Sequence, residues 1–199
     1  METFSSSVEF EDTTFEGIAS DDVLISDREF RDCIFSDSSF NNSEFKNCRF
    51  INCTFKRCDL SLVKFNGSIF RETMFEESKV IGVNWTYASW PKEWTESPIT
   101  FQDCVIDDSV FVGLTLQKIS FRRCTAKGVE FSEADLTEAD FGGSNLTHAK
   151  FRNTNLTRAN FVDATNYNIN LIENQSPGAK FSFPEAMSLL TNLDIELVE

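Results

Sequence analysis

Large apolar side chains recur every five residues along almost the whole chain. Nineteen of the 21 phenylalanines fall on this five-residue grid. The grid follows the multiples of five from residue 10 to residue 90, slips by one position, and continues from residue 101 to residue 181. Only Phe4 and Phe183 lie off it. An internal repeat of this regularity predicts a solenoid.

The period of five matches neither the 3.6-residue period of a helix nor the two-residue period of a strand. We therefore expect a chain that turns a corner every five residues and points one large side chain inward each time. Four such units close a square coil of about 20 residues, and successive coils stack like parallel strands about 4.8 Å apart. The grid holds 17 + 17 = 34 units, so the sequence predicts about eight and a half coils and a rod roughly 40 Å long.

Small residues mark a second inward position, two residues before each large one. Ala, Ser, Cys or Thr occupies 22 of these 34 sites, which is the alternation that close packing in a narrow coil requires. All six cysteines lie at such sites, so we interpret them as small buried apolar residues. Disulfide, redox or metal roles are the alternative for a set of six. The six are Cys33, Cys48, Cys53, Cys58, Cys104 and Cys124.

Residues 18–29 are the first of three breaks in the grid. Ser20 stands at a large-residue site and Arg28 at a small-residue site. One interpretation is a bulged coil or loop in which Asp21 and Asp22 contact a partner. The other is an irregular terminal coil, because terminal repeats are commonly atypical.

Residues 91–100 are the second break, where the frame of the grid shifts. Two prolines bracket this stretch, which favours a projecting loop. Trp94 has no grid site to fill and lies between Glu93 and Glu96. We interpret these three residues as candidate partner contacts, since Trp is enriched at binding hot spots. The alternative is that Trp94 folds back on the surface of the rod.

The C-terminal end is the third break. Ser182 can cap a helix and Pro184 suits its first turn, so we expect a short amphipathic helix from Pro184 to Leu193, followed by a strand-like alternation. The predicted domains are a β-helix over 1–183, interrupted near 91–100, and a dimerisation tail over 184–199. A simple end cap is the alternative to dimerisation. The residues expected to join two copies are Phe183, Met187, Leu190, Leu193, Ile195 and Leu197.

The net charge of −14 is unevenly distributed. Residues 1–45 carry twelve acids and two arginines, a net −10, whereas residues 46–75 carry a net +4. An acidic surface serves solubility or attracts a basic partner, and it disfavours direct nucleic-acid binding, which needs a basic patch. At 199 residues one folded unit is expected, with neither an N-terminal apolar run nor a membrane span. A cytoplasmic protein follows from these features.

The sequence gives no case for catalysis. His148 is the only histidine, and its place two residues after Leu146 predicts that it points outward. The cysteines are expected inside, so no Cys–His pair forms, and a narrow sealed solenoid has no cavity for a substrate. We expect a binding protein with no catalytic residue, no cofactor and no metal site.

Two sets of residues resemble known proteins. The stretches 134–136, 139–141, 144–146 and 159–161 are similar to the consensus of the pentapeptide-repeat family, in which a small residue precedes Asp or Asn and then Leu or Phe. That resemblance implies an all-β, right-handed quadrilateral β-helix. Residues 82–86, 90–91, 163–167 and 183–197 resemble the topoisomerase-protection group of that family, which comprises the Qnr, MfpA and albicidin-resistance (AlbG) types, and they look most like the last of these.

The second resemblance implies a homodimer that mimics DNA, binds bacterial DNA gyrase, with topoisomerase IV as a further candidate, and protects it from poisons such as albicidin or quinolones. Two rods joined end to end would be about 80–100 Å long and carry 2 × −14 = −28 charges, fewer than B-DNA at one charge per about 1.7 Å. The basic band at 46–75 departs from a uniform DNA-like field. The competing hypothesis is a scaffold whose partner is not a topoisomerase.

Overall fold

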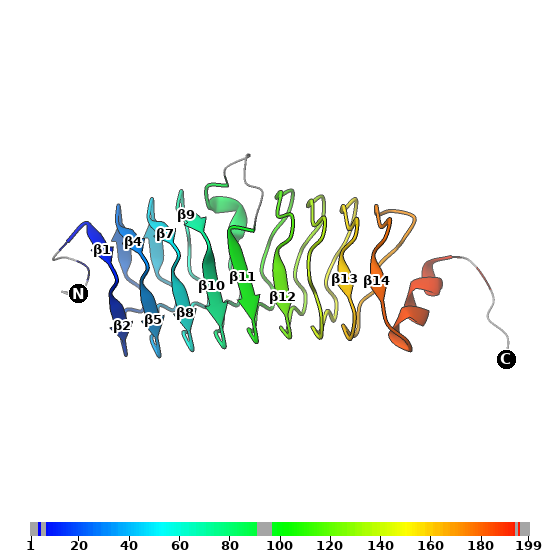
Figure 1. The fold of residues 1–199 in the computed structure, drawn as a ribbon, viewed down its shortest axis with the longest axis horizontal. Coiled ribbons are helices and arrows are strands. Elements are labelled where there is room, and N and C mark those ends of the chain that lie inside the picture. The colour runs from blue at the N-terminus through cyan, green and yellow to red at the C-terminus, as the bar shows by residue number, and fades with distance from the viewer. Residues whose placement is uncertain (1–3, 5–6, 91–96, 194, 196–199) are drawn as a thin grey trace.

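The chain coils into a rod whose turns stack along one axis, with a short helix at its C-terminal end (Figure 1). The computed structural model describes residue 4, residues 7–90 and 97–193, and residue 195. Short strands form the walls of the rod, and η1 and η2 are 3₁₀ helices. The elements are β1 (Glu9–Glu11), β2 (Thr14–Glu16), β3 (Leu24–Ser26), β4 (Glu29–Arg31), β5 (Ile34–Ser36), β6 (Glu44–Lys46), β7 (Arg49–Ile51), β8 (Thr54–Lys56), β9 (Ile69–Arg71), β10 (Thr73–Glu76), η1 (Trp85–Tyr87), β11 (Ile99–Gln102), β12 (Ser120–Arg122), β13 (Asn160–Phe161), β14 (Lys180–Phe181) and η2 (Glu185–Asn192).

All strand pairs are parallel and join equivalent positions of successive coils. The largest sheet has the order β12-β11-β10-β8-β5-β2, and a second has the order β1-β4-β7-β9. The register is 20 residues, as in Phe35↔Phe55, so four five-residue units make one turn. Phe75 pairs with Phe101 at a register of 26. The frame slip is therefore an insertion of 26 − 20 = 6 residues on one corner, and the predicted β-helix is confirmed.

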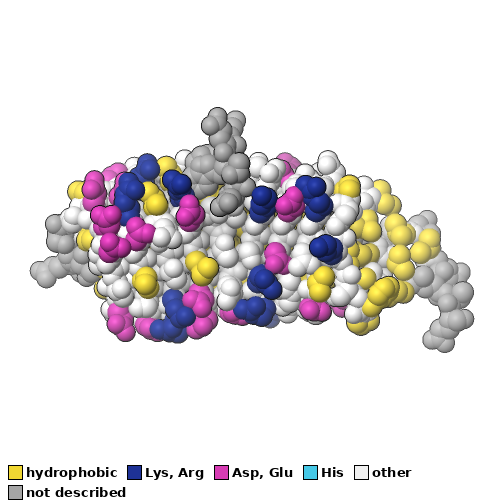
Figure 2. All heavy atoms as spheres, viewed as in Figure 1, with side chains coloured by type: hydrophobic (Ala, Val, Ile, Leu, Met, Phe, Trp, Pro, Cys, Tyr) yellow, Lys and Arg dark blue, Asp and Glu magenta, His cyan; other side chains and the backbone are white. Residues whose placement is uncertain are grey.

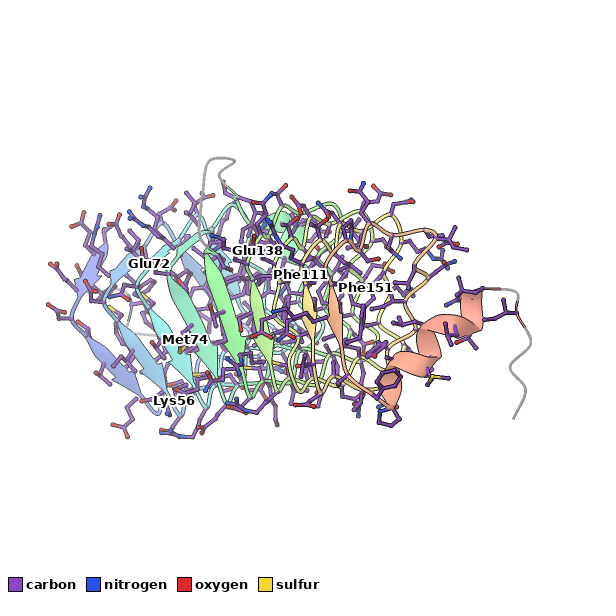
Figure 3. The ribbon with its side chains drawn as sticks, turned by 45° about the vertical axis from the view of Figure 1, so that its right-hand side comes forward. Lys56, Glu72, Met74, Phe111, Glu138 and Phe151 are labelled. Atoms are coloured by element: carbon purple, nitrogen blue, oxygen red, sulfur yellow. The ribbon has the colours of Figure 1, made fainter. Side chains whose placement is uncertain are left out.

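Aromatic rings fill the interior in continuous columns. Phe35 and Phe55 stack with centroids 4.5 Å apart at an interplanar angle of 6°. Rings on neighbouring walls meet edge to face, as Phe45 and Phe50 do at 5.4 Å and 78°. Both geometries are favourable for aromatic quadrupoles, so the columns hold adjacent coils in register. Figure 3 shows Phe111 within the stack of coils.

Each unit turns its corner at the residue two positions after the large one. The backbone there is left-handed, with φ between +47° and +72° at these corners. Gly, Asn and Asp tolerate that conformation best, and they occupy most corners of the first three coils. Leu62, at φ +59°, is an exception, because residues with bulky side chains rarely adopt this conformation. Because one outward position of each unit must adopt this conformation, the outward positions of a unit do not accept all polar residues equally.

Phe4 closes the N-terminal end of the rod. Its ring is buried and lies 5.3 Å from Phe15 and 6.2 Å from Phe40, in the column where Ser20 leaves the large site small. The guanidinium of Arg28 reaches over this end, and its Nε donates to the Phe4 carbonyl at 2.9 Å. The off-grid phenylalanine and the off-pattern arginine therefore form one cap.

The C-terminal end is closed by Tyr167 and η2. Tyr167 replaces the grid residue at 166 and is buried against Phe181, with ring centroids 5.6 Å apart. Leu189 is the buried residue of η2. The expectation that Ser182 caps this helix is wrong, because its hydroxyl instead accepts from the backbone N–H of Asp163 at 2.9 Å. That bond ties the last coil to the coil beneath it.

Candidate partner-binding surfaces

The six cysteines lie inside the coil, as their sequence positions predict. All are buried and free. The thiols of Cys53 and Cys58 each donate to the carbonyl of the residue 23 positions earlier at 3.3 Å, which satisfies their weak donors. Burial raises the pKa of Cys48 to about 11, of Cys53 to about 12 and of Cys58 to about 11. These thiols are therefore protonated at neutral pH and are poor nucleophiles and metal ligands.

Asp21 and Asp22 lie on a regular coil. Ala19 pairs with Ser39, and β3 pairs with β6, at the usual register of 20 residues. The interpretation of residues 18–29 as a bulged coil or loop is therefore wrong, and only the sequence of this terminal coil is atypical. The carboxylate of Asp22 accepts from Asn42 Nδ2 at 2.6 Å, and that of Asp21 accepts from the Asn41 N–H at 2.8 Å. Both aspartates are exposed, so each presents a carboxylate on the outer surface of the first coil.

The basic band at 46–75 is largely paired with carboxylates on neighbouring coils. Arg57 and Asp37 form a bidentate pair at 2.7 and 2.6 Å. Lys56 lies 3.0 Å from Glu76. The hydrogen bond from Arg57 lowers the pKa of Asp37, which keeps the pair charged. The band thus adds little basic field of its own.

Arg49 and Arg71 are paired as well. Arg49 lies 3.3 Å from Glu29 on the preceding coil, and Arg71 lies 3.4 Å from Glu72 beside it. Lys46 and Lys64 have no ion pair within the described part of the chain. Exposed pairs of this kind contribute about 0–1 kcal/mol each, so their main effect is on the surface potential.

A similar ladder continues in the second half of the rod. Arg123 reaches back 20 residues to Asp103 with a bidentate contact at 2.7 Å. Lys150 lies 3.0 Å from Glu130. Such pairs leave the middle of the rod nearly balanced, and the largest excess of acids lies on the first two coils. There, a hollow of about 420 Å³ on the outer wall is lined by Glu9, Phe10, Glu11, Glu29 and Arg31.

His148 is exposed at a corner, as predicted. Within the ranges that the structure describes, three or more His, Cys, Asp or Glu residues nowhere gather closely enough to hold a metal ion. The described helices include none with the length and apolar character needed to cross a membrane.

Apolar side chains gather at the C-terminal end of the rod (Figure 2). Phe183 is 82% exposed, Ile195 55% and Met187 47%, whereas Leu190 and Leu193 are partly buried. These five residues of the predicted dimer interface therefore lie on or next to one end. Sequence reasoning missed that Leu189 is the residue that covers the core, because two adjacent leucines did not reveal which one faces inward.

Two further apolar residues near this end were not predicted. Ile172 is 73% exposed on the last coil, and Val162 is also exposed. Both occupy outward positions, where the repeat usually places a polar residue, and that exception was visible in the sequence. The predicted contacts Glu93, Trp94 and Glu96, together with Leu197, lie outside the described residues.

Solved structures of two proteins resemble the whole rod. QnrB1, a plasmid-mediated fluoroquinolone resistance protein, matches in a trypsin-treated form with a TM-score of 0.68 and 19% identity, over 99% of this chain and 94% of that chain. Its full-length form matches with a TM-score of 0.64 and 17% identity, over 92% of this chain and 100% of that chain. HetL from the cyanobacterium Nostoc sp. strain PCC 7120, a pentapeptide-repeat protein involved in heterocyst differentiation regulation, matches with a TM-score of 0.62 and 17% identity, over 88% of this chain and 87% of that chain.

At these identities the likeness shows the fold alone. No curated protein sequence matches the chain. The family model described as a pentapeptide repeat region matches residues 28–111 and 96–161, which together exceed half of the chain and include the columns of stacked rings. This chain therefore belongs to the pentapeptide-repeat family.

Proposed function

We propose that this protein is a non-catalytic DNA mimic that binds bacterial DNA gyrase and protects it from topoisomerase poisons of the quinolone or albicidin kind. Topoisomerase IV is a second candidate target. The sequence resemblance to the topoisomerase-protection group motivates this proposal. The fold shared with QnrB1, a fluoroquinolone resistance protein, is compatible with it.

The observation that carries the proposal is the ion pairing of the basic band. A basic band on the outside of a DNA mimic would repel a groove that normally holds DNA. Here Arg49, Lys56, Arg57 and Arg71 are all paired with carboxylates of the same rod. The excess of 32 − 18 = 14 acids therefore determines the long-range field and steers the rod toward a basic surface.

The exposed apolar end supports a homodimer through the tail. Phe183, Met187 and Ile195 present apolar surface beyond what Leu189 needs to close the coil. Exposed apolar surface that is concentrated in one place is typical of an interaction site. Two rods joined there would be about 80–100 Å long.

A gyrase supercoiling assay tests the proposal. We expect the protein alone to inhibit supercoiling at high concentration, and to restore supercoiling at lower concentration when a quinolone or albicidin is present. A mobility-shift assay with duplex DNA should show no binding, because the surface is acidic. If the protein neither inhibits nor rescues gyrase or topoisomerase IV at any concentration, the proposal fails.

The alternative is an interaction scaffold with a partner other than a topoisomerase. The match to HetL supports this alternative. HetL is involved in the regulation of heterocyst differentiation, so the same fold occurs in a protein whose described role is not antibiotic resistance. The supercoiling assay separates the two, since a scaffold of this kind leaves gyrase unaffected with and without the poison.

A further inference from the structure

One side of the rod carries a section without charges at its middle. Residues 80–90 and 109–117 contain no Asp, Glu, Lys or Arg, although a quarter of the chain is charged. The two segments lie on adjacent coils, because Trp85 stacks on Phe111 at 5.8 Å and its backbone N–H donates to the Val110 carbonyl at 3.0 Å. We call the outward residues of this side the uncharged section; they are Asn84, Thr86, Tyr87, Val110 and Val112.

Tyr87 is the most prominent residue of the uncharged section. It is 57% exposed at the end of η1. On its corner of the rod it lies between two glycines, Gly67 and Gly113. The Gly67 N–H donates to the Tyr87 carbonyl at 2.8 Å, and a Cβ added at Gly113 would meet no atom within 4 Å. Neither of these two glycines places a side chain beside the phenol ring. On the opposite corner of the same wall, Leu62 is also exposed.

Two polar side chains of the uncharged section, Asn84 and Thr86, are hydrogen-bonded to each other. Asn84 Oδ1 accepts from the Thr86 N–H at 3.0 Å and from the Thr86 hydroxyl at 2.7 Å. These bonds cap η1, and they keep the Asn84 side-chain carbonyl and the Thr86 hydroxyl donor satisfied when the section is covered. Val110 and Val112 are partly exposed beside them. The section thus has a low cost of desolvation compared with the charged walls around it.

Charges of opposite sign border the uncharged section along the rod. Lys64 lies on the preceding coil, and Lys46 lies beside Glu44 on the coil before that. Neither lysine has an ion pair among the described residues. Glu130 and Glu133 lie on the following coil, where Glu130 is 3.0 Å from Lys150. A partner segment that matches this side is apolar in its middle, acidic where it meets the two lysines, and basic where it meets the glutamates.

We propose that the uncharged section is the docking site for such a segment of the topoisomerase, which rests on the function proposed above. Interface cores are depleted in charge and enriched in Tyr, and Tyr is a frequent hot spot. The acids of the first coils steer the approach, and this section supplies the short-range contact. The section is about 10 Å long, too small to hold two acidic rods side by side, because stable dimers bury about 800 Å² per partner.

The test compares two lysine substitutions on one coil. Val110→Lys places a charge in the uncharged section, and Thr100→Lys places the same charge on the opposite wall. Both residues point outward and precede a buried ring, Phe111 or Phe101. Tyr87→Ala removes the proposed hot spot. Thermal melting of each variant and light scattering confirm the fold and the oligomeric state before the protein is assayed.

We expect Val110→Lys and Tyr87→Ala to raise the concentration for half-inhibition of gyrase supercoiling by about tenfold or more, and Thr100→Lys to change it by less than about twofold. If the wild-type protein has no effect on gyrase, the proposed function itself fails. If it is active and Val110→Lys behaves like Thr100→Lys, the docking site lies elsewhere. If Val110→Lys changes the oligomeric state instead, the section holds a second copy of the chain, and the proposal is overturned.

Discussion

Single residues in this rod act through the direction in which the five-residue unit points them. At the small inward sites, hydroxyls connect coils as well as filling space. The Ser68 hydroxyl donates to the Phe45 carbonyl at 2.8 Å and accepts from the Cys48 N–H at 3.0 Å. Serine and cysteine share these sites because both are small and both can satisfy a carbonyl of the preceding coil.

Alkaline pH should destabilise the fold through the buried thiols. In the unfolded chain a thiol ionises near its ordinary pKa of 9.0, whereas burial raises the pKa of Cys48 and Cys58 to about 11 and of Cys53 to about 12. The contribution of these buried thiols to the unfolding free energy is complete below pH 9 and is lost as the pH rises through about 11–12. Each pKa unit corresponds to about 1.4 kcal/mol per thiol.

Urea unfolding at pH 8, 9.5 and 10.5 measures this effect. A variant with Cys48, Cys53 and Cys58 replaced by serine should lose less stability over the same range, because serine does not ionise. Equal losses in the two proteins would contradict the assignment of the effect to these thiols.

The ring columns give a second prediction for single residues. Phe50 is fully buried and stacks on Phe30 and Phe70, each at 5.2 Å. Phe50→Ala should cost about 3–5 kcal/mol of unfolding free energy, because it leaves a cavity in the middle of one ring column. The matched control Phe183→Ala, at the exposed end, should change the unfolding free energy of a monomer by less than about 0.5 kcal/mol.

At the scale of elements, the sequence predicted the coil but not everything that ends it. The five-residue period sufficed for the walls, because each large residue has one inward direction. The left-handed corners were hidden, since Arg57 and Leu62 occupy them as well as Asp, Asn and Gly. The cap by Phe4 and Arg28 was also hidden, because it depends on a contact 24 residues apart that no period reports.

The helix of the C-terminal tail shows the same limit of prediction from the sequence pattern. The segment from Glu185 to Asn192 is helical as predicted, although as a 3₁₀ helix. Which residues cover the core depends on the register between helix and coil, and the sequence pattern left that open. The structure places Leu189 inward and leaves Met187 and Phe183 outside, so the dimer can be tested without opening the core.

Met187→Arg should convert the proposed dimer to monomers. Met187 is 47% exposed, so a charge there disrupts an apolar contact between copies while the closure by Leu189 remains. Leu189→Ala is the contrasting change, and it should lower stability by about 2–5 kcal/mol because it removes the buried residue of the cap. Multi-angle light scattering gives the mass. An intact dimer of the Met187→Arg protein, or a monomeric wild-type protein, would contradict the proposed interface at the tail.

At the scale of the whole molecule, charge and apolar surface lie at opposite ends. Residues 9–45 contain eleven acidic residues and two arginines, whereas the other end exposes Phe183 and Ile195. If copies join through their tails, the strongest negative field lies at the two outer ends of the long rod. The uncharged section on the wall between them is then available for short-range contact.

This separation predicts how gyrase inhibition depends on salt. Exposed charges are screened beyond about 10 Å at 0.1 M salt and beyond about 3 Å at 1 M, so inhibition should weaken as salt is raised within the range that gyrase tolerates. The pair Glu11→Gln and Asp22→Asn should reduce both the association rate and its salt dependence, because it removes carboxylates that face solvent on the first coil.

The control for this prediction is Asp103→Asn together with Glu138→Gln, which changes the net charge by the same amount. Asp103 and Glu138 are paired with Arg123 and Arg158, so removing their charges alters the field at the middle of the rod instead of at its tip. Surface plasmon resonance with immobilised gyrase separates association from dissociation. If both pairs of substitutions lower the association rate equally, total charge governs the approach and the acidic tip has no special role; if only the first pair does, the rod approaches its partner by its ends.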